Sequence, residues 1–188
     1  MASSGYAELF IPLENLDIDN MTIHPPTSIY PIRIPVSILS YTTTFIMPKL
    51  CILTPFLKIH SWDATNGRLE LVAGEMTSII NSLQETLIQK LVKNPNWSSL
   101  TSHTYEDVKG RFQPLVINNN IVLYTTIQCP DTIIIYNDTG IHHISENSFQ
   151  KGQYARVALR FQGLVFLKNM NGGLFYRLQH QISRIYCK

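Results

Sequence analysis

Acidic residues are few in this chain, and none follows Glu146. Only 15% of the 188 residues are charged and 45% are hydrophobic, a balance that argues against intrinsic disorder and indicates a globular protein. Residues 151–188 contain seven of the fifteen Lys and Arg residues and no Asp or Glu. Residues 1–20 contain four acids and no base. The net charge of +2 therefore hides a basic C-terminal end and an acidic N-terminal end, a combination compatible with a nucleic-acid-binding protein.

Cysteines and long apolar runs are also scarce. The three cysteines, Cys51, Cys129 and Cys187, are odd in number and far apart, so they predict no disulfide framework and favour a reducing, intracellular compartment. The N-terminus lacks the pattern of a signal peptide, and no run approaches the roughly 20 apolar residues of a membrane span. We therefore expect an intracellular protein that has no membrane partner.

Motifs of catalysis and of metal binding are missing. The chain has no glycine-rich phosphate loop, no Gly-x-Ser-x-Gly elbow and no Cys-x-x-Cys pair. His142 and His143 are adjacent, and adjacent residues on a strand point to opposite faces, so one ion is not easily held by both. The sequence thus predicts no enzyme, no cofactor and no metal site. A nuclease or processing factor whose carboxylates meet only in the fold is the competing reading from the enzyme class.

Strand patterns dominate what the chain does contain. Runs rich in β-branched and aromatic residues, separated by turn residues, predict strands at residues 29–39, 45–53, 56–62, 69–73, 111–117, 121–128, 132–136, 141–144, 154–167 and 174–186. Residues 65–68, Thr-Asn-Gly-Arg, predict a tight turn. Many short strands of this kind favour a mainly β fold: a partly open antiparallel barrel similar to the oligonucleotide-binding (OB) fold.

One segment has the period of a helix. Apolar residues at three- and four-residue spacings predict an amphipathic helix at residues 75–93, ended by Asn94 in a left-handed cap and by Pro95. Residues 96–110 show no period and are expected to form a long loop. Residues 1–28, acidic and containing Pro12, Pro25 and Pro26, are expected to form an arm. The expected domain organisation is therefore an acidic arm at 1–28 and one barrel domain at 29–188.

The basic C-terminal hairpin holds the candidate binding residues. Alternation places Tyr154, Arg156, Ala158, Arg160 and Gln162 on one side of the first strand, and Phe175, Arg177, Gln179 and Gln181 on one side of the second. Guanidinium groups pair with phosphates and flat rings stack on unpaired bases, so this combination suits single-stranded nucleic acid. The candidate contacts are Tyr154, Arg156, Arg160, Phe175, Arg177, Lys151 and Lys168, with Trp97 and Tyr105 from the long loop. The alternative is a sheet with one solvated side, whose rings are core or rim packing.

The order of these segments resembles a known family. Ile52-Leu-Thr-Pro55, an amphipathic helix ending near Trp97, and Lys151-Gly152 leading into a final hairpin resemble the replicative single-stranded DNA-binding proteins of large DNA viruses. Those proteins are similar in layout to the helix-destabilising proteins of T7-like phages, which are built on an OB barrel. The resemblance covers roughly residues 45–186. One departure is that the chain lacks the acidic C-terminal tail with which phage proteins of this kind recruit partners.

The resemblance implies a function and a set of partners. It implies a non-enzymatic protein that coats and protects single-stranded DNA during viral replication or recombination, at replication sites in the host cytoplasm or nucleus. RNA is the alternative ligand. Replication proteins are the implied protein partners, and the acidic N-terminal arm is a candidate for recruiting them or for exchange between subunits of a homo-oligomer. A viral structural or capsid-associated β protein remains the competing function.

Overall fold

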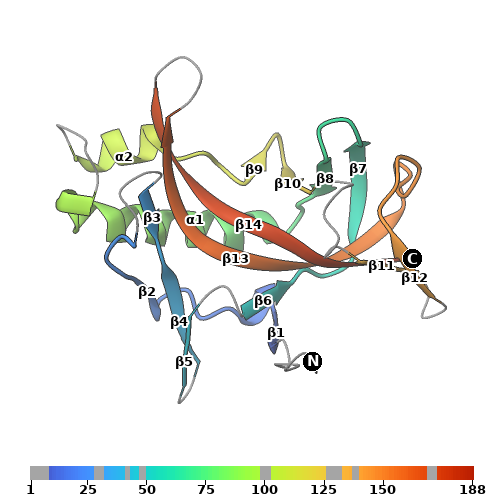
Figure 1. Ribbon diagram of the computed structural model, residues 1–188, viewed down its shortest axis with the longest axis horizontal. Coiled ribbons are helices and arrows are strands. Elements are labelled where there is room, and N and C mark those ends of the chain that lie inside the picture. The colour runs from blue at the N-terminus through green and yellow to red at the C-terminus, as the bar shows by residue number, and fades with distance from the viewer. Residues whose placement is uncertain are drawn as a thin grey trace, which may run out of the picture.

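Strands are the main secondary structure of the part of the chain that the structure describes. The computed structural model describes residues 9–27, 32–40, 43–46, 50–97, 103–125, 133–136, 140–168 and 173–188. Within these residues a curled, open antiparallel sheet forms a half-barrel, and two α-helices lie beside it (Figure 1). The prediction of a mainly β fold with a partly open barrel is confirmed at this level.

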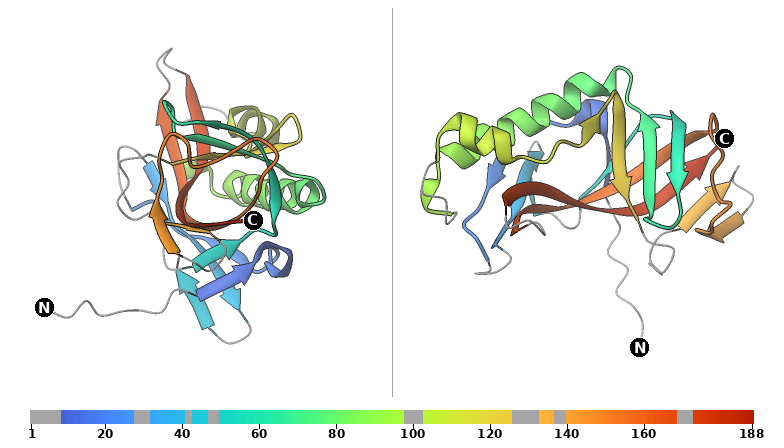
Figure 2. Two further views of the ribbon diagram at one scale, coloured as in Figure 1. Left: turned by 90° about the vertical axis from the view of Figure 1, so that its right-hand side faces the viewer. Right: turned by 90° about the horizontal axis from the view of Figure 1, so that it is seen from above.

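The C-terminal hairpin is the longest part of the sheet. β13 (Tyr154–Lys168) pairs antiparallel with β14 (Leu174–Cys187), which confirms the predicted hairpin, although most of its turn lies outside the described residues. The pairing register shifts between Ala158 and Leu159 and again between Phe161 and Gly163. Such bulges bend a strand and increase its twist. The hairpin accordingly curves along its length (Figure 2).

Three shorter strands carry the sheet from β13 round toward β14. β7 (Leu57–Asp63) pairs with the start of β13, β8 (Arg68–Val72) pairs with β7, and β10 (Asn120–Tyr124) pairs with β8. The two-residue strand β9 (Val116–Ile117) pairs with β10. Each of the four pairings from β14 to β10 is antiparallel, so β10 and β14 run in the same direction.

β10 and β14 meet at a seam that is bridged by single contacts. The backbone N–H of Tyr124 donates to Nε2 of His180 over 3.2 Å, and the backbone N–H of Gln113 donates to the carbonyl of Tyr176 over 2.8 Å. Within the described ranges no ladder joins β10 to β14. The barrel is therefore open along this seam.

The turn predicted at residues 65–68 and the turn at residues 118–119 both contain backbone in the left-handed region. Between β7 and β8, Gly67 has a φ of 60°, and both the backbone and the side chain of Asn66 donate to the carboxylate of Asp63. These hydrogen bonds hold the pKa of Asp63 below its ordinary value. Between β9 and β10, Asn118 and Asn119 have φ values of 51° and 62°, a conformation that Asn tolerates better than most residues.

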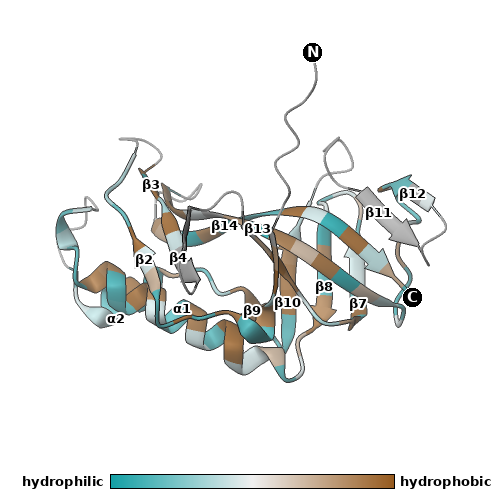
Figure 3. Cartoon of the chain, turned by 90° about the horizontal axis from the view of Figure 1, so that it is seen from below, coloured by the Kyte–Doolittle hydropathy of each residue, from teal (hydrophilic) through white to brown (hydrophobic). Residues whose placement is uncertain are grey.

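The helix α1 (Met76–Val92) confirms the amphipathic helix predicted at residues 75–93. Figure 3 shows polar and apolar residues alternating along the helix. Its buried side chains form one stripe on the face toward the core: Ile80, Leu83, Leu87, Ile88 and Leu91. Its C-terminal end differs from the prediction, because Asn94 does not adopt a positive φ. The side-chain amide of Asn94 instead donates from Nδ2 to the backbone carbonyl of Lys90 over 2.9 Å. This carbonyl is one of those at the C-terminal end of a helix that have no partner within the helix.

The prediction of a single helix is wrong. The expected loop at residues 96–110 begins in a 3₁₀ turn, η2 (Pro95–Trp97), and ends in a second helix, α2 (Tyr105–Arg111). Thr104 caps α2: its hydroxyl accepts from the backbone N–H of Asp107 over 3.3 Å and donates to the Asp107 carboxylate. Thr104 and Asp107 have the spacing of a capping box, with Asp in place of Glu or Gln at the third helical position. Neither helix within the described ranges is long and apolar enough to cross a membrane.

The segment expected to be an arm is built into the fold from residue 9 onward. β1 (Leu9–Pro12) pairs parallel with β6 (Leu50–Leu53), η1 (Leu13–Asn15) follows it, and β2 (Met21–Ile23) joins a small second sheet. Its apolar side chains enter the core: Leu13, Leu16, Met21 and Ile23 are all buried. The free energy gained by burying these four side chains is larger than any preference of the acidic residues between them for water, so the segment joins the fold.

The prolines and the second sheet explain how the next strands divide. β4 (Val36–Ser40) pairs with β2 and with β5 (Thr43–Ile46), whereas β3 (Ile32–Ile34) and β6 pair with β13. Pro35 separates β3 from β4, as expected of a residue that cannot donate to a ladder. The strand expected at residues 45–53 is therefore two strands in two sheets.

The remaining hairpin lies at the other end of the large sheet. β11 (Ile133–Tyr136) pairs antiparallel with β12 (Gly140–His143) and parallel with the last residues of β14. The hairpin predicted in this region is confirmed. In Figure 2 the helices lie alongside the half of the β13–β14 hairpin nearest its turn, and β7, β8 and β10 lie alongside the other half.

Candidate nucleic-acid interface

The start of β13 changes its neighbouring strand, and this change positions Arg156. Residues 158–160 pair with β6 and residues 154–155 with β7. Thr54 fills the interval: its backbone N–H donates to the carbonyl of Val157, and its hydroxyl accepts from the Val157 N–H, each over 2.9 Å. The Thr54 carbonyl then accepts from Nε of Arg156 over 2.9 Å. The guanidinium of Arg156 is therefore held by the backbone carbonyl of Thr54, a residue that is fully buried.

The outer face of this part of the sheet is both basic and aromatic. Ala155, Val157 and Leu159 point into the core, so the alternate residues Tyr154 and Arg156 point outward. The register places Lys58 opposite Tyr154, Tyr186 opposite Arg156, and Arg184 opposite Ala158. We call the following set the basic–aromatic face: Phe10, Phe56, Lys58, Tyr154, Arg156, Arg184, Tyr186 and Lys188.

Cations lie over rings across this face. Nζ of Lys188 is 4.1 Å and Cζ of Arg156 is 5.9 Å from the centroid of the Phe56 ring. On β1, the ring of Phe10 lies 5.2 Å from Cζ of Arg184. The Tyr154 ring is 49% exposed, the most exposed large apolar side chain among the described residues. The face thus combines cations in fixed positions with one freely accessible ring.

Three of the four cations of this face are not balanced by carboxylates of the described residues. Within the described residues, Glu70 on β8 forms an ion pair with Arg68 over 2.8 Å and lies 3.9 Å from Nε2 of His60 on β7. No carboxylate of the described residues lies within ion-pair distance of Lys58, Arg156 or Lys188. The face therefore presents a net positive charge to solvent.

The structure places several of the sequence-predicted residues on the same outer side of the hairpin. Arg160 lies opposite Gln181, and beyond the bulge Arg177 lies opposite Val165, so the two polar sets share one side of the sheet. Arg177 is remote from Arg156 and lies over the ring of Tyr124, 5.9 Å from its centroid. Lys151 is exposed just before β13, and Lys168 is exposed at the far end of that strand. Predicted residues thus occur at both ends of the hairpin.

The aromatic candidates separate into three locations. Tyr154 lies at the start of β13, whereas Phe175 lies opposite Leu167 near the hairpin turn, roughly 40 Å away along the strand. Trp97 and Tyr105 pack against the core beside α1, and the Tyr105 hydroxyl donates to the carboxylate of Glu85 over 2.8 Å. The structure therefore brings Tyr154 to the basic–aromatic face and leaves the other three rings outside it.

Six of the eight residues of the basic–aromatic face were not among the sequence-predicted contacts. Arg184 and Tyr186 carry a signal in the sequence, because they continue the alternation of the last strand. Phe10, Phe56, Lys58 and Lys188 carry none, because their positions depend on the pairing of β1 with β6 and on the Thr54 junction. Strand order is a property of the whole fold and is not written in local patterns.

The titratable groups near this face do not form a reactive site. Burial raises the pKa of the Cys187 thiol to about 11 and raises that of Cys51, so both thiols are poor nucleophiles. Among the residues that the structure describes, no group of three or more His, Cys, Asp or Glu side chains is placed to hold a metal ion. The chemistry that this face offers is electrostatic pairing and stacking. Comparisons of the chain with protein-family models, with curated proteins and with solved structures give no match.

Proposed function

We propose that the chain binds single-stranded nucleic acid, with single-stranded DNA as the first ligand to test, through the basic–aromatic face. The observation that carries the proposal is the set of three cation–ring contacts at Phe10 and Phe56, beside an exposed Tyr154. Phosphates require cations, and unpaired bases require accessible rings. A single strand offers both partners along one backbone.

The arrangement of Arg156 suits a phosphate contact. Its Nε donates to the Thr54 carbonyl, and its Cζ lies over the Phe56 ring at 5.9 Å from the centroid, so its position is fixed before a ligand arrives. A guanidinium that stacks on a ring keeps its terminal N–H groups at the edge, where they can donate to phosphate oxygens. Preorganisation of this kind reduces the entropy that binding costs.

The strand order supports an OB-type barrel. β7, β8 and β10 are successive neighbours, and β13 returns to lie beside β7, which gives the Greek-key order β13-β7-β8-β10 with β14 as the fifth strand. In chain order the five strands are β7, β8, β10, β13 and β14, and the helix α1 lies between the second, β8, and the third, β10. OB barrels commonly bind oligonucleotides across the second and third strands. Here those strands are β8 and β10, where Arg68 is neutralised by Glu70, so we favour the basic–aromatic face.

The corresponding biological role is that of a coating protein. A sequence-independent protein of this kind covers a single strand, denies it to its complement and protects it during replication or recombination. This agrees with the resemblance to the single-stranded DNA-binding proteins of large DNA viruses. Replication proteins would then be its protein partners, and the viral replication site its location.

Two exposed tyrosines provide a matched test of the proposed face. We expect Tyr154→Ala to weaken binding of a fluorescent single-stranded oligonucleotide by about 1–3 kcal/mol, the usual contribution of one stacked base. Tyr124→Ala removes a ring of comparable exposure, 38%, from β10 and should have a smaller effect. Melting temperatures of both variants check that they are folded. A folded Tyr154→Ala variant with unchanged affinity contradicts the proposal, as does a wild-type chain that binds no oligonucleotide at low salt.

A further inference from the structure

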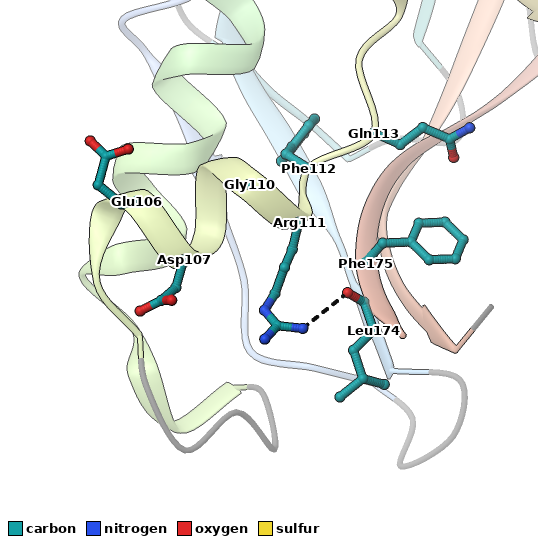
Figure 4. A pocket seen from close by; sticks show the side chains of 8 residues that line it. All are labelled: Glu106, Asp107, Gly110, Arg111, Phe112, Gln113, Leu174 and Phe175. Carbon is teal, nitrogen blue, oxygen red and sulfur yellow. Dashed lines mark hydrogen bonds between the residues drawn. The ribbon is translucent and has the colours of Figure 1, made fainter. Parts of the chain in front are cut away.

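A pocket lies at the far end of the β13–β14 hairpin, where α2 meets the start of β14. Its volume is about 700 Å³, within the range of small-molecule sites. It is lined by Glu106, Asp107, Gly110, Arg111, Phe112, Gln113, Leu174 and Phe175 (Figure 4). The floor at Gly110 is open, because a Cβ built there meets no atom within 4 Å. The pocket is separated from Tyr186 by roughly 35 Å along β14.

One half of the pocket is charged. Arg111 donates from Nη1 to the carbonyl of Leu174 over a long 3.4 Å, and no carboxylate of the described residues lies within ion-pair distance of it. Most of the N–H groups of its guanidinium therefore remain available to an anion. The carboxylates of Asp107 and Glu106 stand on the helix side of the same half. They disfavour a bare anion and favour one that also carries hydroxyl donors.

The other half of the pocket is aromatic and neutral. In Figure 4 the ring of Phe175 and the amide of Gln113 lie on the opposite side of the pocket from Asp107. Both side chains are only partly buried, so a ligand can reach them. A flat ring can stack on Phe175, while the amide offers one donor group and one acceptor to the edge of that ring.

We infer that this pocket binds a nucleotide, with the phosphate at Arg111 and the base against Phe175 and Gln113. The ribose hydroxyls then face Asp107 or Glu106, which accept hydrogen bonds from sugar hydroxyls as acidic residues do in dinucleotide sites. The preference for a nucleotide over another aromatic anion rests on the proposed function. The nucleotide is either a free monomer or the terminal nucleotide of a strand, and both present the same phosphate, sugar and base.

Titration of the ¹⁵N-labelled full chain with AMP tests the pocket directly. We expect saturable shifts of the amide signals of Gly110, Gln113 and Phe175, and weaker binding of adenosine and of inorganic phosphate than of AMP. Arg111→Gln and Phe175→Leu should each weaken AMP binding by about tenfold or more, the loss expected when a charged hydrogen bond or a stacked ring is removed. Tyr124→Leu, which removes an exposed ring on β10 that belongs neither to this pocket nor to the basic–aromatic face, is the matched control and should bind AMP like the wild type.

The outcomes separate this inference from the proposed function. Absence of shifts at millimolar AMP, or AMP binding that survives both pocket substitutions in folded protein, overturns the inference even if oligonucleotides still bind in a Tyr154-dependent way. AMP binding in a chain that binds no oligonucleotide keeps the pocket and removes the proposed function. Competition with AMP by a 5′-phosphorylated oligonucleotide, and not by its unphosphorylated form, identifies the terminal nucleotide as the ligand. Absence of competition by either strand identifies the free monomer.

Discussion

At the scale of single residues, protonation of His180 would affect the stability of the fold. Its Nε2 accepts from the backbone N–H of Tyr124 over 3.2 Å, which places the ring proton on Nδ1, 3.4 Å from the carbonyl of Leu178. Burial, aided by the nearby charge of Arg177, lowers the pKa of His180 from 6.5 to about 4. A proton on Nε2 would remove the acceptor that links β14 to β10 across the open seam.

The sign of the resulting pH dependence follows from linkage. Because the folded-state pKa lies below the unfolded value, the unfolded chain binds the proton first as the pH falls. The contribution of His180 to stability is therefore complete above pH 6.5, decreases between pH 6.5 and about 4, and is lost below that. A shift of this size corresponds to about 3 kcal/mol.

Urea unfolding at pH 7 and at pH 4.5 measures this effect in the wild type and in His180→Gln. The variant cannot titrate at this position, so its free energy of unfolding should fall less between the two pH values. The carboxylates contribute the same acid sensitivity to both chains and cancel in the comparison. Equal losses of stability in the two proteins contradict the role given to His180.

Residue-scale reasoning from the sequence succeeded where alternation decides the outcome. Tyr154 and Arg156 point outward because Ala155 and Val157 are needed in the core, and a strand gives no other choice. It could not reveal that the Arg156 guanidinium is fixed by Thr54 or that Phe56 lies beneath it. Those contacts link positions about one hundred residues apart in the chain, and no local pattern encodes them.

At the scale of elements, the helix α2 was not predicted, although the sequence before it contains a helix-capping signal. Thr104 and Asp107 have the spacing of a capping box, but α2 spans only seven residues and buries Val108 alone. A hydrophobic period cannot be recognised in so short a helix. The helix is stabilised by its cap and by packing against α1 and β14, and packing partners are unknown until the fold is known.

Gly163 determines how β13 passes between two neighbouring strands. It has a φ of 108°, and a Cβ added there would lie 2.6 Å from the carbonyl oxygen of Ile34 on β3. The position coincides with the second register shift of β13, just before the residues that pair with β3. Only a residue without a side chain satisfies both the backbone conformation and the close approach.

We therefore expect Gly163→Ala to lower the free energy of unfolding by about 2 kcal/mol or more, through backbone strain and displacement of β3. Gly110→Ala is the matched control, since its Cβ meets no atom within 4 Å, and it should raise the stability of α2 slightly, by about 0.5 kcal/mol. Chemical denaturation of both variants measures the two values. Similar stability in the two variants contradicts the steric role of Gly163.

At the scale of the whole molecule, the kind of fold was predictable and its closure was not. The turn at residues 65–68 and the long C-terminal hairpin follow from turn residues and alternation, so the β character and these two local pairings were predicted correctly. The return of β13 to β7, the seam bridged by His180, and the insertion of β1 beside β6 depend on long-range pairings. The acidic character of residues 1–20 suggested an arm, but the buried Leu13 and Met21 decided the outcome.

The positive charge of the basic–aromatic face predicts how salt changes the binding of a single strand. Positive charge on the basic–aromatic face comes from β7, β13 and β14 together, so it becomes one surface only when the barrel is assembled. Each phosphate neutralised on that surface releases condensed counterions from the strand. The logarithm of the binding constant for a single strand should therefore fall linearly with the logarithm of the salt concentration, with a slope of about 0.7 for each phosphate contact.

Charge-removing variants show which cations make those contacts. Arg156→Gln and Lys188→Gln should each flatten the slope by about 0.7, and the double variant by about twice as much, because each cation meets its own phosphate. Arg68→Gln removes an exposed charge that already pairs with Glu70 outside the face, so its slope should equal that of the wild type. Fluorescence titrations of one oligonucleotide over a range of salt concentrations measure the slopes of the wild type and of the four variants. If Arg68→Gln flattens the slope and Arg156→Gln does not, the strand crosses β8 and β10, and the basic–aromatic face is not its path.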